Sequence, residues 1–205
     1  MDKQGKAQPG DRAGLDPALD REPEALPRPV DDDDHQLGRR SAPVELLEYG
    51  DYECPYCAQA AAPVRRLTER YGDDLLYVFR HFPLVSQHPH AFRAAVAAEA
   101  AGAQGRFWEM HDLLLASQPA LGPTDLVQYA RAIGLDVPSF ESALVDPVLA
   151  ERVRSDALNG VRSGVLGTPT FFANRRRIEG GLREPELDGA IQAALRSTDA
   201  RPQER

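Results

Sequence analysis

The chain has 205 residues, a formal net charge of −8 at pH 7 and a hydrophobic share of 42%. This length and apolar content suit one domain with a real hydrophobic core. The acidic balance argues against nucleic acid as a partner, and no stretch approaches the ~20 apolar residues needed for insertion into a membrane.

The N-terminus lacks the apolar run of a secretory signal, so we expect a cytoplasmic location. The expectation becomes periplasmic or extracytoplasmic if a leader was removed or the start is misassigned. Two cysteines in a reducing compartment would not be kept as a structural crosslink, which favours a catalytic or metal-binding use.

Residues 1–40 are predicted to form a disordered, acidic, proline-rich tail. They contain five prolines and the acidic run from Asp31 to Asp34, and they show no periodic apolar pattern. We interpret them as a solvated leader without a binding role, with docking or targeting as the alternative. A second disordered end is expected at residues 198–205.

A globular pattern begins at residue 41. Residues 44–49 are β-prone, residues 58–70 favour helix, and residues 75–79 form a near-continuous apolar run typical of a strand covered on both faces. Strand, helix and strand in this order predict a right-handed βαβ unit with a parallel strand pair.

Apolar spacing of three and four residues then predicts an all-helical insertion over residues 85–164. Thr124 and Ser139 are candidate N-caps within it. The cluster of Phe107, Trp108 and Met110 is interpreted as core rather than as a cofactor site, and no cofactor is expected. The five expected helices cover residues 90–103, 106–117, 124–134, 139–144 and 147–164.

Residues 165–197 return to strand chemistry and end in a helix. Residues 168–173 are β-prone, residues 177–179 can return antiparallel, and Leu187, Ile191 and Leu195 mark the last helix. The predicted fold is therefore α/β, with a central mixed sheet. Its core would comprise residues 41–84 and 165–197, with the helical insertion between the βαβ and ββα halves.

Both cysteines stand in the motif Cys54-Pro55-Tyr56-Cys57, at the junction of the first strand and helix. Pro55 suits the first position of a helix, which would make Cys54 the N-cap, facing unpaired backbone N–H groups and the positive end of the helix dipole. Cys57 would lie one turn deeper on the same face. Because only a thiolate attacks a disulfide, we predict Cys54 as the attacking and Cys57 as the resolving thiol.

Three histidines, His81, His88 and His90, cluster loosely in the sequence and could suggest a metal site shared with the cysteines. A closed zinc site needs four ligands, usually from two paired motifs, and the chain has a single cysteine pair. We therefore expect no metal. His111, on an amphipathic helix, is interpreted as structural.

Three segments together carry a family resemblance: residues 48–57, residues 104–112 and residues 167–172. They resemble the DsbA-like thioredoxin family over about residues 34–192, and also the thioredoxin domains fused to bacterial sodium/proton antiporters. The resemblance implies a thioredoxin-like fold and a cis-proline at Pro169 lying against the two cysteines. It also implies that the main chain of Thr168 binds a substrate peptide in strand-like fashion. An ordinary trans proline that starts a strand is the alternative.

The resemblance further implies a buried acid six positions before the first cysteine, at Glu48, which would exchange a proton with Cys57. The alternative is a Glu48 that faces solvent. Tyr56 stands where the strongly oxidising family members have histidine, and it cannot act as a cation. We therefore predict a Cys54 pKa and a reduction potential between those of strong oxidants and reductants. The Cys-Pro-Tyr-Cys motif also resembles that of glutaredoxins.

The function expected from these residues is thiol–disulfide oxidoreductase, exchanging disulfides with protein or glutathione-type thiols. Pro55, Tyr56, Thr168 and Pro169 are the expected substrate-binding residues. The alternative is a redox-inactive interaction module in which the surface around Tyr56, Thr168 and Pro169 holds an extended peptide.

Overall fold

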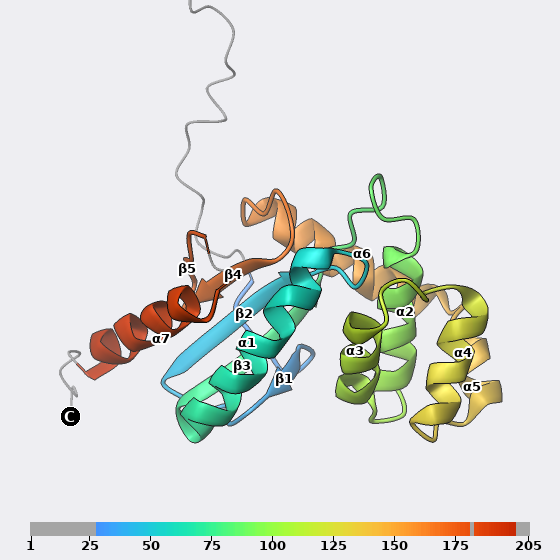
Figure 1. The fold of residues 1–205 in the computed structure, drawn as a ribbon, viewed down its shortest axis with the longest axis horizontal. Coiled ribbons are helices and arrows are strands. Elements are labelled where there is room, and N and C mark those ends of the chain that lie inside the picture. Colours follow the sequence, from blue (N-terminus) through green and yellow to red (C-terminus); the bar gives the residue numbers. More distant parts are fainter. Residues whose placement is uncertain (1–27, 181–182, 200–205) are drawn as a thin grey trace, which may run out of the picture.

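The computed structural model describes residues 28–180 and 183–199 (Figure 1). A short 3-10 turn, Gly72–Asp74, links the first long helix to the strand that follows it. The strands are β1 (His35–Leu37), β2 (Val44–Gly50), β3 (Leu75–His81), β4 (Thr170–Ala173) and β5 (Arg176–Arg177). The helices are α1 (Pro55–Tyr71), α2 (Ala91–Gly102), α3 (Phe107–Ala116), α4 (Pro123–Ala132), α5 (Val137–Ala143), α6 (Pro147–Arg162) and α7 (Glu184–Asp199).

The five strands form one mixed sheet in the order β1-β3-β2-β4-β5. The central pair, β2 and β3, is parallel and connected through α1, as the βαβ prediction requires. Strand β4 runs antiparallel to β2, and β5 antiparallel to β4. The predicted fold class, a thioredoxin-like mixed sheet with a helical insertion, is confirmed.

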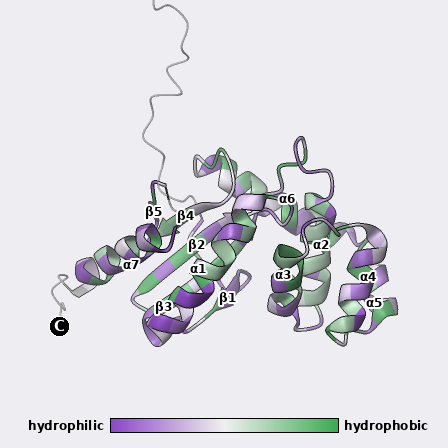
Figure 2. Ribbon diagram, in the orientation of Figure 1, coloured by the Kyte–Doolittle hydropathy of each residue, from purple (hydrophilic) through white to green (hydrophobic). Residues whose placement is uncertain are grey.

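The alternation of side chains along the strands builds a core on each face of the sheet. Leu46 of β2 belongs to the larger cluster, which also holds Leu67 of α1 and Ile191 of α7. Its neighbour Leu47 points to the opposite face, into a second cluster against which Ala157 of α6 packs. Helix α7 accordingly alternates between hydrophilic and hydrophobic residues in Figure 2.

The insertion contains the five predicted helices, and α2 to α5 lie beside one end of the sheet (Figure 1). Two predicted caps are wrong. Helix α4 begins one residue before Thr124, at Pro123, whose fixed φ suits a first helical position. Helix α5 is capped by Asp136, whose carboxylate accepts a hydrogen bond from the backbone N–H of Ser139 at 2.9 Å.

The predicted boundaries of the two terminal tails need correction. Residues 28–40 belong to the fold, since β1 pairs antiparallel with β3, His35 opposite Phe79. A three-residue strand is too short to show a period in the sequence. The rest of the predicted N-terminal tail, residues 1–27, lies outside the described residues. Helix α7 runs through Asp199, past the predicted end at 197, and residues 200–205 are not described.

A buried ion pair ties the N-terminal segment to the sheet. Arg80 on β3 is fully buried and donates two hydrogen bonds to the carboxylate of Asp34, at 2.8 and 2.7 Å. A further donated bond reaches the carbonyl of Pro29 at 3.0 Å. Burial alone would raise the pKa of Asp34, but the hydrogen bonds and charge of Arg80 hold it below its ordinary value. Nε and Nη2 of the guanidinium are therefore satisfied by groups that precede residue 40, while Nη1 also donates to the side-chain oxygen of Asn159 on α6 at 3.0 Å.

No helix among the described residues has the length and apolar character that crossing a membrane requires.

Replacing Asp34 by alanine should lower the free energy of unfolding by about 3–5 kcal/mol, because it leaves a buried guanidinium without its counter-charge. Denaturant unfolding of the full chain measures this. The matched control is Asp73→Ala, which removes the exposed pair between Asp73 and Arg39 (2.9 Å) and should cost about 1 kcal/mol or less. Equal losses in the two variants would contradict a structural role for the buried pair.

Candidate active site

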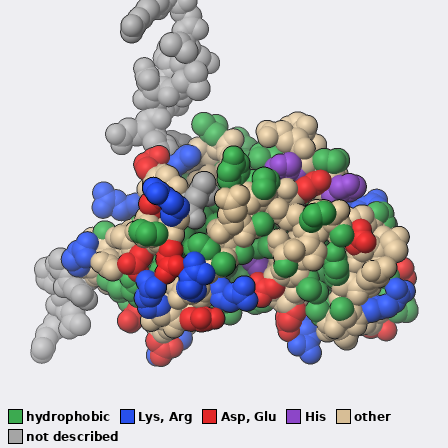
Figure 3. Space-filling view, viewed as in Figure 1, with side chains coloured by type: hydrophobic (Ala, Val, Ile, Leu, Met, Phe, Trp, Pro, Cys, Tyr) green, Lys and Arg blue, Asp and Glu red, His purple; other side chains and the backbone are tan. Residues whose placement is uncertain are grey.

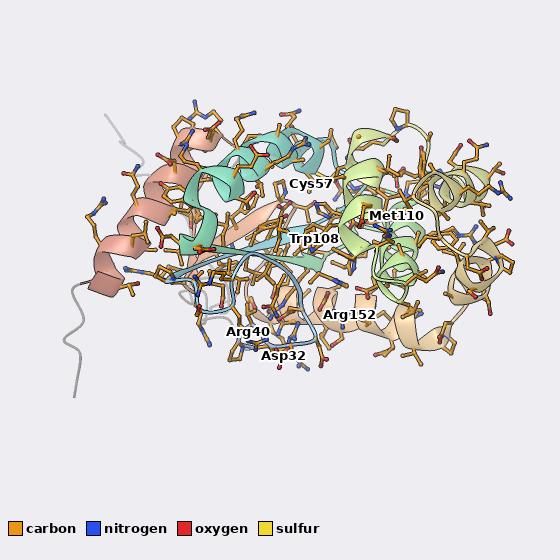
Figure 4. The ribbon with its side chains drawn as sticks, turned by 90° about the horizontal axis from the view of Figure 1, so that it is seen from below. Asp32, Arg40, Cys57, Trp108, Met110 and Arg152 are labelled. Atoms are coloured by element: carbon orange, nitrogen blue, oxygen red, sulfur yellow. The ribbon has the colours of Figure 1, made fainter. Side chains whose placement is uncertain are left out.

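The cysteine motif occupies the N-terminus of α1. Pro55 is the first helical residue and Cys54 is the N-cap, with extended backbone angles of φ −76° and ψ 120°. The turn before it is closed by Asp51, whose carbonyl accepts from the N–H of Cys54 at 3.1 Å and whose carboxylate accepts from the N–H of Glu53 at 2.8 Å. The predicted position of Cys54 at the helix start is confirmed. Figure 4 shows Cys57 at the end of α1 that faces the helical insertion.

The two sulfurs have opposite acidities. The hydrogen bond from the Cys57 thiol is the largest cause that lowers the pKa of Cys54, to about 5, with help from Thr168 and the backbone N–H groups of Cys57 and Tyr56. Burial chiefly raises the pKa of Cys57 well above its ordinary value, and the sulfur of Cys54 and the charge of Glu48 add to this. At neutral pH, Cys54 is therefore a thiolate and Cys57 a thiol. A pKa of about 5 falls between the ~3.5 and ~7 of strongly oxidising and reducing relatives.

The loop before β4 lies against the first cysteine. The Thr168–Pro169 peptide bond is cis. The sulfur of Cys54 is 3.2 Å from the carbonyl oxygen of Thr168, so the structure brings together residues that are far apart in the sequence. Cys54 itself is only 3% exposed. Beside it, a hollow of about 310 Å³ is lined by Tyr56, Thr168, Pro169 and part of the β4–β5 hairpin.

Glu48 lies in the middle of β2, opposite Phe79 on one side and Phe171 on the other. It is 2% exposed, so the alternative of a solvent-facing Glu48 is wrong. Its Oε2 accepts a hydrogen bond from the hydroxyl of Tyr77 at 2.7 Å. Burial is the main cause that raises the pKa of Glu48, to about 8; Tyr77 opposes this rise and the charge of Cys54 adds to it. A carboxyl group with this pKa can accept and return a proton near neutral pH.

Two polar residues at the site had no assigned role in the sequence analysis. The backbone N–H of Asp51 donates to the sulfur of Cys57 at 3.4 Å, and Asp51 is 2% exposed. The side-chain amide of Gln118, just after α3, donates to the carbonyls of Tyr52 at 3.0 Å and Cys54 at 2.6 Å. Asp51 lies three residues before the motif, and this proximity could have indicated a role at the site. Gln118 is 64 residues beyond Cys54, and nothing in its local sequence pointed to it.

Of the three predicted histidines, His81 does not lie with the cysteine motif. His81 meets His35 and Glu99 instead, and one carboxylate oxygen of Glu99 lies 2.9 and 2.8 Å from the two Nε2 atoms. The other oxygen is 2.8 Å from Nε of Arg152, so this carboxylate already has a cationic partner. Nδ1 of His81 is buried and has no hydrogen-bond partner among the described residues. Because the carboxylate of Glu99 is paired with both Nε2 atoms and with Arg152, we interpret the trio as a structural network.

His111 is buried against Tyr52, whose hydroxyl lies 3.1 Å from its Nδ1. Burial chiefly lowers the pKa of His111, to about 3. A histidine that stays neutral in the core fits the predicted structural role.

Comparison with known proteins places this arrangement among related sequences. The family model described as Thioredoxin matches residues 31–193. The Na(+)/H(+) antiporter NhaA 1 of Salinispora arenicola is 49% identical over 177 residues, which cover 86% of this chain. The protein of the same name from Mycobacterium sp. is 45% identical over 172 residues, or 82% of the chain. The chain spans only 27% and 28% of the length of these two relatives.

Solved structures show the same architecture. A thioredoxin-like oxidoreductase from Silicibacter pomeroyi superposes with a TM-score of 0.73 at 26% identity, over 81% of this chain and 94% of the other. Alpha-DsbA1 of Wolbachia pipientis gives a TM-score of 0.74 at 22% identity, over 85% and 96%. BdbD from Bacillus subtilis gives 0.72 at 23% identity, over 78% and 92%. The last two likenesses bear on the fold alone.

In the reduced protein, one thiolate should appear near pH 5 and belong to Cys54, while Cys57 should stay protonated to the top of the accessible range. The measurement is the ultraviolet absorbance of thiolate against pH, with Cys54→Ser to assign the step. A single step near the ~8.5 of free cysteine would contradict this asymmetry.

Glu48→Gln should stabilise the protein increasingly as pH rises from about 5 to 8. In that window the folded chain holds a proton on Glu48 that the unfolded chain releases, so the wild type loses about 1.4 kcal/mol of unfolding free energy per pH unit from this group. Glutamine does not titrate and avoids this loss. Unfolding of both proteins across the window measures the difference, and a difference that does not change with pH would place Glu48 in solvent contact.

Proposed function

Because this chain belongs to the thioredoxin family, we propose that it is a thiol–disulfide oxidoreductase that exchanges disulfides with protein or glutathione-type thiols. The observation that carries the proposal is the opposite acidity of the two sulfurs, with the pKa of Cys54 lowered to about 5 and that of Cys57 raised. A nucleophile must be ionised before the substrate arrives, whereas a resolving thiol should stay protonated until the mixed disulfide has formed.

The first step is attack of the Cys54 thiolate on a substrate disulfide. A bond forms between Cys54 and one substrate sulfur, the substrate S–S bond breaks, and the second substrate sulfur leaves as a thiolate that is protonated from solvent. The negative charge on Cys54 disappears in this mixed disulfide. Two causes that raise the pKa of Cys57, the hydrogen bond and the charge from Cys54, disappear with it.

The second step is resolution by Cys57. Loss of the Cys54 charge also removes one cause that raises the pKa of Glu48, which favours its carboxylate form. This carboxylate accepts the Cys57 proton, and the Cys57 sulfur attacks Cys54, which closes the Cys54–Cys57 disulfide. The bond between Cys54 and the first substrate sulfur breaks, and this sulfur leaves as a thiolate and is protonated, so one substrate disulfide becomes two thiols while the protein dithiol is oxidised. The same steps in reverse oxidise a substrate dithiol.

The substrate would bind in the hollow next to Cys54. Tyr56 is 54% exposed at its edge and offers an aromatic surface, while Thr168 and Pro169 form its wall. The carbonyl of Thr168, which lies against the Cys54 sulfur, would accept a main-chain hydrogen bond from an extended peptide. Pro55 would fix the direction in which the helix presents Cys54.

Cys57→Ser should trap a mixed disulfide between Cys54 and glutathione when the reduced variant is mixed with glutathione disulfide, because resolution is blocked. Mass spectrometry identifies the adduct. Cys54→Ser is the control and should form far less adduct, since the remaining thiol is buried and protonated. Equal adducts in both variants would reverse the assigned roles, and a wild type that never exchanges with glutathione would favour the redox-inactive binding module.

A further inference from the structure

We propose that His88, held by Asp51, supplies the positive charge that stabilises the Cys54 thiolate in this chain. The inference rests on the proposed function, because it explains how the nucleophile of that reaction is stabilised. No cation stands between the two cysteines, where the sequence has Pro55 and Tyr56. His88 lies in the loop of residues 82–90, between β3 and α2, and Figure 3 shows histidine side chains at the surface in this region.

The contacts of Asp51 fix this loop against the motif. One carboxylate oxygen accepts hydrogen bonds from Nδ1 of His88 and from the backbone N–H of Leu84, each at 2.8 Å. Asp51 is buried, whereas the side chain of His88 remains 18% exposed. The imidazole is therefore anchored at Nδ1 while part of the ring stays in contact with solvent, from which it can take a proton.

Asp51 also contacts both cysteines through its main chain, as described above. Its carbonyl receives the N–H of Cys54 at 3.1 Å, and its N–H reaches the sulfur of Cys57 at 3.4 Å. The histidine is thus attached to the same residue that orients the motif. A short rigid connection of this kind keeps a charge at a constant distance from the nucleophile.

The charges around His88 favour its protonated form. Burial lowers the pKa of His88, but the hydrogen bond and charge of Asp51, followed by the charges of Cys54 and Glu53, raise it above the ordinary value of 6.5. Glu53 is itself held in place, since its carboxylate accepts from the backbone N–H of His90 at 2.6 Å. Coupling between two sites is reciprocal, so a thiolate that favours the imidazolium is stabilised by it to the same extent.

This coupling gives the reactivity of Cys54 two steps in pH. The thiolate forms near pH 5, while His88 is still protonated. As pH rises through the raised pKa of His88, the stabilising charge is lost. The thiolate then becomes more basic and, by its Brønsted dependence, a faster nucleophile. The alkylation rate should therefore rise once near pH 5 and again above pH 6.5.

The decisive variant is His88→Gln, which keeps a hydrogen-bond donor for Asp51 but carries no charge. Its Cys54 pKa should be higher by about half a unit, or about threefold in the thiol–thiolate equilibrium, and the second rise in the iodoacetamide rate should vanish. His90→Gln is the matched control on the same loop. It removes a neighbouring imidazole but not the His90 N–H that binds Glu53, and it should keep both steps.

A second measurement leaves His88 in place. The pKa of His88, followed by NMR of the full chain, should fall in Cys54→Ser relative to the reduced wild type, because the thiolate that raises it is gone. An unchanged pKa there, or a His88→Gln variant that behaves like His90→Gln, would overturn the inference. Failure of the proposed function is a separate result. In that case the wild type would not exchange with glutathione disulfide, regardless of the pKa measured for His88.

Discussion

The active site depends on one hydrogen bond, from the thiol of Cys57 to the sulfur of Cys54. This bond leaves the negative charge on Cys54 and the proton on Cys57, one helical turn away. It can form because α1 begins at Pro55 and places both side chains on one face. The surrounding groups reinforce the division. Backbone N–H groups of Cys57 and Tyr56 add to the lowering of the Cys54 pKa, whereas burial and the charge of Glu48 raise the pKa of Cys57.

The scaffold keeps this helix start fixed by enclosing it from three sides. Strand β2 carries Glu48 and leads into the turn at Asp51, and β4 brings Thr168 across from the far end of the chain. The helical insertion contributes Gln118. The buried pair of Arg80 and Asp34 then closes the opposite face of β3, so the sheet behind the motif is covered by the N-terminal segment and by α6.

Features that depend only on residues close in the sequence could be predicted from the sequence. Pro55 at a helix start, Cys57 one turn on and the apolar run of β3 each follow from neighbouring residues, and the structure agrees with them. Long-range partners were not predictable from spacing. Gln118 meets Cys54 only because α3 packs beside α1, and Asp34 joins the core only because β1 pairs with β3. Its acidic run resembled a solvated tail because the partner, Arg80, lies 46 residues away.

The two outer strands of the sheet have a consequence for behaviour in crowded solution. At one border β1 has three residues, and at the other β5 has two, both arginines. Edge strands this short offer few free backbone N–H and carbonyl groups to a strand of another molecule, and the arginines of β5 add positive charge at one edge. The molecule can thus expose the hollow next to Cys54 without favouring edge-to-edge association between copies of its sheet.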